Sequence, residues 1–273
     1  MKEIQWIVSD LDGTLLNDQK QVSQKNQKAI QWLFEQGIDF GIVSGRPVKT
    51  IYETLDFWQI KPYVRFIIGM NGAAFMDIST QEITYAPSLS LDVIQKIMNH
   101  FKGWDVCFQI LDEKIRYTNR STDSSIQYTT KCHEREVVTD LIEYSKKNRV
   151  LKWMIYCEPQ MMEQVRKHAN ALNENQISAI QTDDCMLEFM SADIHKGSGL
   201  LKASKQLHLD LKTCLSLGDA DNDVSMFDVT GYSFCVQNGT KYAKEKSKQV
   251  LPYTNEEDII DKIVREYIDV YRW

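Results

Sequence analysis

The amino-acid sequence predicts an α/β fold, in which a three-layer core built on a parallel sheet is interrupted by an inserted α+β domain. In both terminal parts of the 273-residue chain, short apolar runs alternate with helix-like segments. Such alternation requires crossover connections and therefore favours a parallel sheet. The alternation gives way to a different rhythm in the middle of the chain. Hydrophobic residues make up 43% and charged residues 26%, as is typical of a globular protein with a sizeable core.

The N-terminal part predicts strand, helix, strand, helix and strand in that order. The apolar run at residues 4–8 predicts a buried strand that ends at an Asp-rich turn. Ser23 is suited to cap the next helix and Gly37 to end it, because apolar residues recur between them at helical spacing. The remaining elements expected here are a strand at 38–43, a helix at 48–57 and a strand at 66–68.

The middle of the chain predicts helices and short strands in an α+β order, and the first rhythm returns after it. Within this insert we expect helices at 91–101 and 161–172 and strands at 106–111, 114–117, 153–157, 177–181 and 186–190. After it we expect a helix from 196, a strand at 213–217, a helix from 222, a strand at 233–236 and a C-terminal helix with an apolar stripe. We therefore predict a core of residues 1–81 and 191–273 and an inserted domain of residues 82–190.

Composition excludes several classes of partner. The net charge of −6 provides no basic surface for nucleic acid or for an anionic membrane, so we expect neither partner. No apolar stretch approaches the roughly 18 residues needed to span a bilayer, and the first residues show no secretory signal, so we expect a cytoplasmic protein. The six cysteines are widely spaced without a C-x-x-C pattern, which favours buried reduced thiols over a zinc or redox centre.

Polar residues of chemically useful types follow several of the predicted strands. Ligands of open parallel sheets bind at the carboxyl ends of the strands, so residues far apart in sequence can meet there. The residues concerned are Asp10 and Asp12 after the first strand, Ser44 after the second, and Asp219, Asn222 and Asp223 after the strand at 213–217, with Lys196 preceding that strand.

The segment from Asp10 to Thr14 is the most informative of these. Of two carboxylates two residues apart, one can attack phosphorus while the other transfers protons. Gly13 permits a tight backbone path, and Thr14 can hold a phosphate oxygen. Taken alone, the segment is also compatible with a solvated Asp-rich turn.

The acidic segment at residues 218–223 suits a hard cation with oxygen ligands. A calcium loop of the EF-hand type does not fit, because Val224 would occupy its glycine position and Thr230 its final glutamate position. Octahedral Mg²⁺, held by few carboxylates together with phosphate and water, fits better. The alternative is an Asp/Asn-rich turn in which Asn222 caps the next helix.

Lys196, His195, Ser44 and Arg46 are unremarkable in isolation. Lys196 alone would be an ordinary surface lysine, and its neighbour His195 would more often be structural. Ser44 could cap a helix, with Arg46 and Pro47 just beyond it.

Taken together, these segments resemble the haloacid dehalogenase (HAD) superfamily of phosphohydrolases, and more narrowly its Cof-like sugar-phosphatase branch. Residues 10–14 resemble the first motif of the family, residues 44–47 the second, Lys196 with Gly197 the third, and residues 218–223 the fourth. The insert resembles the large α+β cap of this branch, and Asn71-Gly72-Ala73 precedes it as the family pattern expects. The resemblance implies a Rossmann-like core and a cap that sets substrate specificity.

The resemblance also implies a role for each matching residue. Asp10 would be the nucleophile and a Mg²⁺ ligand. Asp12 would be the general acid and base, with its backbone carbonyl on the metal, and Asp219 would be the remaining metal carboxylate. The other implied roles are phosphoryl binding by Ser44 and Lys196, phosphate or substrate contact by Asn222, Gly45 and Arg46, and support of the site by Thr14 and Asp223.

The implied function is Mg²⁺-dependent hydrolysis of small phosphate monoesters, either sugar phosphates or phosphorylated cofactors, through an aspartyl-phosphate. One alternative is a phosphotransferase or phosphomutase that uses the same intermediate. A non-catalytic sensor of phosphorylated ligands is disfavoured because Asp10, Asp12 and Asp219 are all present, and a P-type ATPase is disfavoured by Asp12 and by the lack of membrane spans. The expected partner is a small-molecule phosphate ester, bound by a monomer or weak homo-oligomer.

Overall fold

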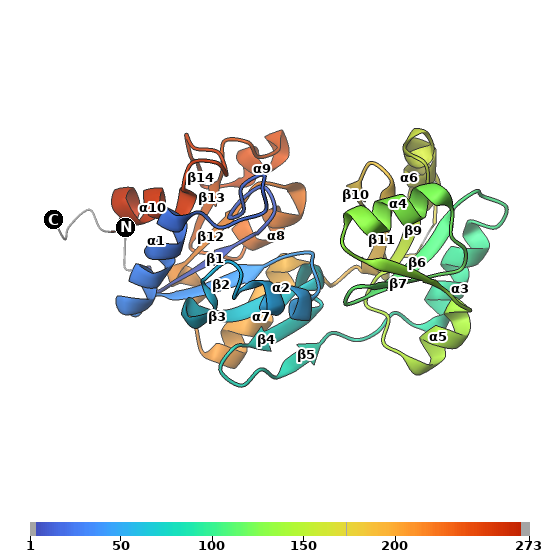
Figure 1. Ribbon diagram of the computed structural model, residues 1–273, viewed down its shortest axis with the longest axis horizontal. Coiled ribbons are helices and arrows are strands. Elements are labelled where there is room, and N and C mark those ends of the chain that lie inside the picture. Colours follow the sequence, from blue (N-terminus) through green and yellow to red (C-terminus); the bar gives the residue numbers. More distant parts are fainter. Residues whose placement is uncertain (1–3, 173, 269–273) are drawn as a thin grey trace. The chain divides into compact units, whose positions relative to one another are not determined.

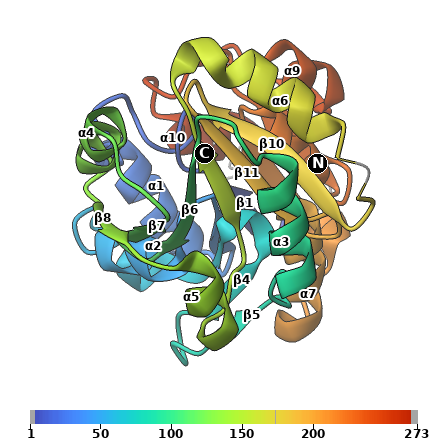
Figure 2. The same cartoon turned by 90° about the vertical axis from the view of Figure 1, so that its right-hand side faces the viewer.

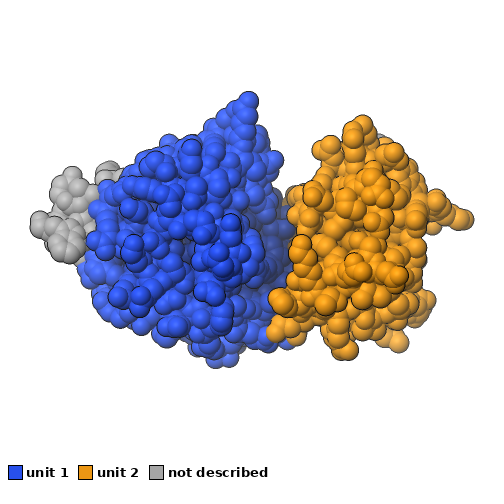
Figure 3. Space-filling view, turned by 45° about the horizontal axis from the view of Figure 1, so that its top comes forward, with its two compact units in different colours: residues 1–85, 194–273 blue, residues 86–193 orange. Residues whose placement is uncertain are grey.

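The computed structural model describes residues 4–172 and 174–268, which form two compact units. The core unit comprises residues 1–85 and 194–273, and the insert unit comprises residues 86–193 (Figure 3). The sequence placed the two divisions slightly earlier, after residues 81 and 190. The first division lies later because strand β5 (Ile83–Tyr85) pairs with β4 (Ala74–Asp77) at the edge of the core sheet. Within the described ranges, no helix has the length and apolar character needed to cross a membrane.

The core unit is built on an eight-stranded sheet in the order β14-β13-β12-β1-β2-β3-β4-β5 (Figure 1). Its strands are parallel from β14 to β3, and β4 and β5 are antiparallel additions. This arrangement confirms the predicted α/β class. The bounds of the other strands are Trp6–Ser9 (β1), Asp39–Val43 (β2), Val64–Gly69 (β3), Cys214–Gly218 (β12), Tyr232–Cys235 (β13) and Gln249–Val250 (β14).

Helices cover both faces of this sheet because the chain winds outward from β1 in both directions. One face carries α7 and α8, which pack on a cluster that includes Trp6, Val43 and Phe66. On the other, α1 packs against α10. The helix bounds are Gln24–Glu35 (α1), Val48–Thr54 (α2), Lys196–Leu207 (α7), Val224–Phe227 (α8), Lys241–Lys246 (α9) and Ile259–Ile263 (α10), the last continued by the π-helix Val264–Ile268. Short 3-10 turns lie at Lys61–Tyr63, Met70–Gly72, Leu211–Thr213 and Asp221–Asp223.

The residues that precede α1 and α7 cap these helices. The hydroxyl of Ser23 accepts a hydrogen bond from the Asn26 amide, so Ser23 caps α1 as predicted. Nδ1 of His195 accepts from the Ser198 amide at 3.2 Å and caps α7, whose first residue is Lys196. The structural role expected for His195 is therefore to hold the start of the helix that carries Lys196.

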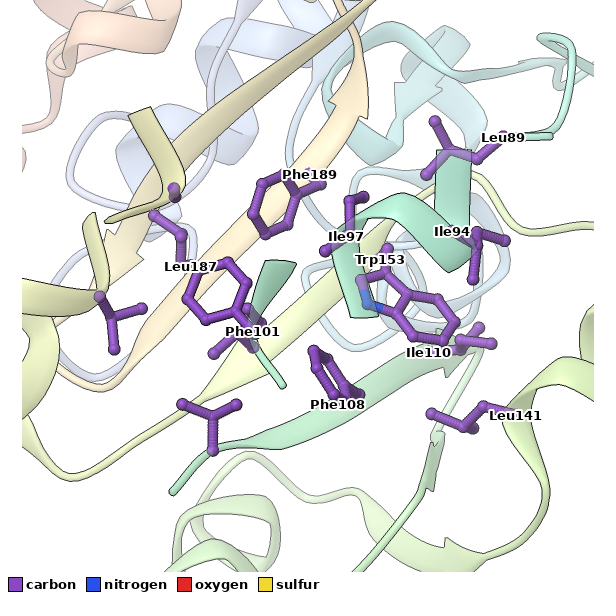
Figure 4. Packing of buried hydrophobic residues seen from close by; sticks show 14 of the residues in the cluster. Leu89, Ile94, Ile97, Phe101, Phe108, Ile110, Leu141, Trp153, Leu187 and Phe189 are labelled. Atoms are coloured by element: carbon purple, nitrogen blue, oxygen red, sulfur yellow. The ribbon is translucent and has the colours of Figure 1, made fainter. Parts of the chain in front are cut away.

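The insert unit contains a six-stranded sheet in the order β10-β11-β9-β6-β7-β8. Helices α3, α5 and α6 lie over one face of it (Figure 2), where aromatic side chains such as Phe108 and Trp153 form a dense apolar core (Figure 4). The strands are Cys107–Asp112 (β6), Ile115–Thr118 (β7), Arg135–Val138 (β8), Trp153–Tyr156 (β9), Ile177–Asp183 (β10) and Met186–Ser191 (β11). The helices are Leu91–His100 (α3), Asp123–Lys131 (α4), Leu141–Lys147 (α5) and Met162–Asn170 (α6), with a 3-10 turn at Pro159–Met161.

All six cysteines are free thiols. Five of them are buried, in agreement with the expectation of reduced, packed thiols, whereas Cys132 is exposed. Cys132 differs because it lies at the C-terminal cap of α4, where the helix ends at the surface.

Candidate active site

The centre of the core sheet brings two of the predicted segments together. Strands β1 and β12 are parallel neighbours, with Ser9 paired to Leu217, and the strand order reverses at this point. The Asp10 amide continues the ladder by donating to the Leu217 carbonyl at 2.9 Å. Asp10 and Asp219 therefore leave adjacent strand ends at the topological switch point, which is where open parallel sheets bind ligands.

A buried lysine links two of the acidic residues. Nζ of Lys196 lies 2.6 Å from Oδ1 of Asp10 and 2.6 Å from Oδ1 of Asp223, and the Lys196 side chain is only 1% exposed. Burial alone would lower the pKa of this lysine, but the two carboxylates outweigh it and raise the pKa above its usual value. Lys196 is therefore a permanently charged group inside the site.

The cluster around Lys196 contains more carboxylates than cations. Burial raises the pKa of Asp10 to about 8, opposed by the charge of Lys196 and reinforced by the charges of Asp223 and Asp219. Burial also raises the pKa of Asp219 to about 6, although the Thr14 hydroxyl, which donates to Asp219 Oδ1 at 2.6 Å, works against this rise. Ionising both acids would leave uncompensated negative charge, which a bound cation would relieve.

The acidic cluster fits a hard divalent cation. One oxygen each of Asp10, Asp219 and Asp223 lies within 4.8 Å of the other two, and all three donors are carboxylates. Asp223 has both oxygens engaged, because Oδ1 contacts Lys196 and Oδ2 accepts from the Asp219 and Ala220 amides at 2.9 Å each. Asp10 and Asp219 are therefore the residues best placed to hold Mg²⁺, while Asp223 positions Asp219 and Lys196.

Gly13 makes room for this cluster. A Cβ atom at Gly13 would lie 2.7 Å from Oδ2 of Asp219, and the backbone has a φ of +79° that favours glycine. The neighbouring Thr14 is fully buried and directs its hydroxyl to Asp219. Thr14 thus supports an acidic residue of the site.

Asp12 lies in a different electrostatic environment from Asp10. Arg46 donates to both carboxylate oxygens, from Nε at 2.8 Å and from Nη2 at 2.6 Å, and Lys20 donates from Nζ at 2.9 Å. Burial alone would raise the pKa of Asp12, but the hydrogen bonds and charges of Arg46 and Lys20 outweigh it and hold the pKa below its usual range. In this arrangement Asp12 is ionised and can accept a proton.

The segment after β2 provides a hydroxyl donor. Ser44 is 2% exposed, and its Oγ accepts from the Arg46 amide at 3.2 Å, which leaves the hydroxyl hydrogen available to another acceptor. The Ser44 amide donates to Ile68 and its carbonyl accepts from Asn71, so the backbone around Ser44 and Gly45 is held on both sides.

Asn222 lies against a residue to which sequence reasoning gave no role. Its Nδ2 donates to Oδ1 of Asn71 at 3.3 Å, while its own Oδ1 is buried and has no hydrogen-bond partner within residues 4–172 and 174–268. Two further supporting residues also escaped the sequence analysis. Lys20 binds Asp12, and Asn238 donates from Nδ2 to the Gly13 carbonyl at 2.7 Å. Of Asn71, Lys20 and Asn238, only Asn71 was marked in the sequence, by the motif Asn71-Gly72-Ala73.

Comparisons with known proteins identify the family of the chain. The family model described as haloacid dehalogenase-like hydrolase matches residues 7–263. A putative phosphatase from Streptococcus pyogenes is 25% identical, covering 95% of this chain and 97% of its own. A 5-amino-6-(5-phospho-D-ribitylamino)uracil phosphatase from Bacillus subtilis is 24% identical over 97% and 96% of the two chains. The solved structure of a haloacid dehalogenase-like hydrolase from Bacteroides thetaiotaomicron has a TM-score of 0.83 at 22% identity, covering 96% and 98%.

Proposed function

The chain belongs to the haloacid dehalogenase-like hydrolase family, and from this premise we propose that it is a Mg²⁺-dependent phosphatase that transfers the phosphoryl group of small monoesters to Asp10 and then to water. The observation that carries the proposal is the buried contact between Asp10 and Lys196 at the switch point of the sheet, with Asp219 alongside. A phosphotransferase would use the same residues, and no feature of the described chain favours it over hydrolysis.

Asp10 is proposed as the nucleophile. Its Oδ1 is occupied by Lys196, and no donor from the described residues reaches Oδ2, so Oδ2 is available to attack phosphorus. The fixed contact with Lys196 orients the carboxylate, which lowers the entropic cost of reaching the reactive geometry.

Three donors are proposed to stabilise the phosphoryl group as it moves to Asp10. The Lys196 ammonium supplies positive charge, the Ser44 hydroxyl supplies a free hydrogen, and the Asn222 amide supplies N–H groups. Donors fixed in advance in a buried site stabilise a transition state without reorganising at the moment of reaction. When bound by Asp10, Asp219 and the backbone carbonyl of Asp12, Mg²⁺ would reduce the repulsion between the Asp10 carboxylate and the anionic phosphate.

Asp12 is proposed to move the protons. Ionised and paired with Arg46 and Lys20, Asp12 can accept a proton from the water that attacks the phosphorylated Asp10. Protonating the departing alkoxide in the first step requires a neutral Asp12, so the ion pairs with Arg46 and Lys20 must loosen when the ester is bound. Arg46 then becomes available to the anionic substrate.

The insert unit is proposed as the cap that selects the substrate, which we expect to be a sugar phosphate or a phosphorylated cofactor. All the residues assigned a chemical step lie in the core unit, outside residues 86–193. The Bacillus subtilis relative is named for a phosphorylated ribitylaminouracil, so this compound belongs in any panel of candidate substrates.

The test is phosphate release from sugar phosphates, nucleotides and phosphorylated cofactors, with Mg²⁺ and with EDTA. We expect Mg²⁺-dependent hydrolysis of several small monoesters by the parent, and none above background by the Asp10→Asn variant. Equal release by the two proteins, or undiminished release in EDTA, would contradict the proposal.

A further inference from the structure

The turn formed by residues 70–72 has an unusual backbone. Met70, Asn71 and Gly72 have φ values of 53°, 52° and 102°, so three consecutive residues adopt a left-handed conformation. Residues other than glycine rarely adopt positive φ values, because this backbone conformation is strained for them. Such strain persists only where surrounding contacts enforce it. Asn71 is also buried, with an exposed fraction of only 6%. This combination is typical of a segment that holds a functional site in place.

The backbone of this turn contacts two segments of the active site. The Met70 amide donates to the Arg46 carbonyl and the Asn71 amide donates to the Ser44 carbonyl, each at 3.0 Å. On its other side, Gly72 packs so tightly that a Cβ there would lie 2.3 Å from the carbonyl oxygen of His195, next to Lys196 in the chain. The turn therefore lies between the proposed phosphoryl ligands Ser44 and Lys196.

The side chain of Asn71 contacts the third segment, through Asn222. The side-chain amide of Asn71 lies close to Gly45, because a Cβ atom added at Gly45 would be 3.2 Å from Oδ1 of Asn71. The same Oδ1 accepts a hydrogen bond from Nδ2 of Asn222. Within the described part of the chain, the bond to Asn71 is the one hydrogen bond made by the side-chain amide of Asn222, since Oδ1 of Asn222 has no partner. Asn71 therefore determines which way the Asn222 amide faces.

The orientation of that amide matters for phosphate. A phosphoryl group offers acceptor oxygens, so Asn222 contributes when it presents N–H groups and opposes binding when it presents Oδ1. Nδ2 has two hydrogens. One is directed at Oδ1 of Asn71, and the other has no hydrogen-bond partner among the described residues, so it is available to an acceptor.

We propose that Asn71 is a positioning residue for the phosphoryl site, which holds the Asn222 amide with its N–H groups toward the phosphate. The inference rests on the proposed function, because it assumes that Asn222 contacts the phosphoryl group. It predicts that losing Asn71 weakens phosphate binding only while Asn222 is present. No hydrogen bond joins Asn71 to Asp10 or Asp219 among the described residues, so the Mg²⁺ requirement should not change.

The test is a double-mutant cycle with Asn71→Gly and Asn222→Ala, read as the inhibition constant of inorganic phosphate and as KM. Glycine favours the left-handed backbone, so Asn71→Gly removes the amide without opposing the turn. We expect each single variant to raise both constants by about tenfold, as for loss of one hydrogen bond to a charged group, and the double variant to match Asn222→Ala. The Mg²⁺ concentration for half-maximal activity should stay at the parental value.

Gln81→Gly is the matched control, because Gln81 also has a left-handed φ of 57° but lies exposed between β4 and β5. It should leave both constants unchanged. If Asn71→Gly melts well below the parent, the cycle is measured at a temperature at which all four proteins are folded, as checked by circular dichroism. Losses that add in the double variant, or an unchanged phosphate constant in Asn71→Gly, would overturn the inference while the parent remains an active phosphatase. A parent that hydrolyses no monoester would instead refute the proposed function.

Discussion

The ammonium of Lys196 lies 2.6 Å from Oδ1 of Asp10, although 186 positions separate the two residues. Replacing Asp10 with Asn keeps the shape of the side chain but removes the attacking carboxylate. We expect kcat to fall by about 10⁴-fold or more, the scale seen when a nucleophile is removed, with folding retained. Hydrolysis of p-nitrophenyl phosphate and circular dichroism check the two parts. Near-parental turnover would exclude Asp10 as the nucleophile.

Lys196→Met should destabilise the protein as well as inactivate it. The substitution leaves Asp10 and Asp223 buried without their shared cation, and breaking a buried ion pair in this way costs about 3–5 kcal/mol. Urea unfolding measures the loss. Lys202→Met is the control, since Lys202 is exposed on the same helix α7. A stability equal to that of the control would show that the lysine is not what compensates the two acids.

Mg²⁺ should stabilise the protein more at pH 8 than at pH 5.5. The folded-state pKa values of Asp10 and Asp219, about 8 and about 6, both lie above the ordinary value of 3.8. The folded state therefore holds more protons than the unfolded state, and without metal these groups reduce stability as the pH rises from about 4 to about 8. Mg²⁺ binds the ionised carboxylates and removes that loss, so its effect grows over the same window.

The measurement is the shift in melting temperature on adding Mg²⁺ at each pH, which does not depend on activity. Asp219→Asn should reduce the shift at pH 8, because one carboxylate of the site is lost. A shift that is equal at both pH values, or larger at pH 5.5, would argue against metal binding by these two acids.

Asp12→Ala should slow alkyl phosphates more than aryl phosphates in the first chemical step. An alkoxide leaving group needs a proton from Asp12, whereas p-nitrophenolate leaves without one. Attack of water on the phosphorylated Asp10 should be slow for both esters, so phosphoenzyme should accumulate. Rapid-quench kinetics on one ester of each kind distinguish the steps. Small and equal losses, with dephosphorylation at the parental rate, would remove Asp12 from the mechanism.

The strands of the parallel part of the sheet were predictable because each is marked by its own short stretch of sequence. The apolar runs that became β1, β2, β3, β12 and β13 are buried on both faces, and such strands are continuous hydrophobic segments in the sequence. The edge strands β4, β5 and β14 and the region from α4 to α5 escaped prediction. Helix α4, for example, has only two apolar or aromatic residues, Ile126 and Tyr128, so it shows no apolar stripe.

Residue types in the site were predictable, but their pairing was not. The sequence pointed to Asp10, Lys196 and Asp219, because motif order and sheet geometry bring strand ends together. It contained no information on the Asp12 carboxylate turning to Arg46, 34 positions away, or on Asn71 meeting Asn222 across 151 positions. Such contacts depend on side-chain directions that exist only after the units have folded.

The order of pairing in the core sheet also has a consequence during synthesis of the chain. Strand β1 pairs with β2 on one side and with β12 on the other, and β12 is made about 200 residues after β1. The insert unit is one continuous segment, so it can fold on the ribosome while one edge of β1 still waits for its partner. We expect a nascent chain that is stalled when residue 193, but not β12, has left the ribosomal exit tunnel to protect the insert unit from protease while β1 stays cleavable. The polypeptide would then acquire its reactive centre among the last steps of translation, and until then an open strand edge is exposed to mispairing and to chaperones.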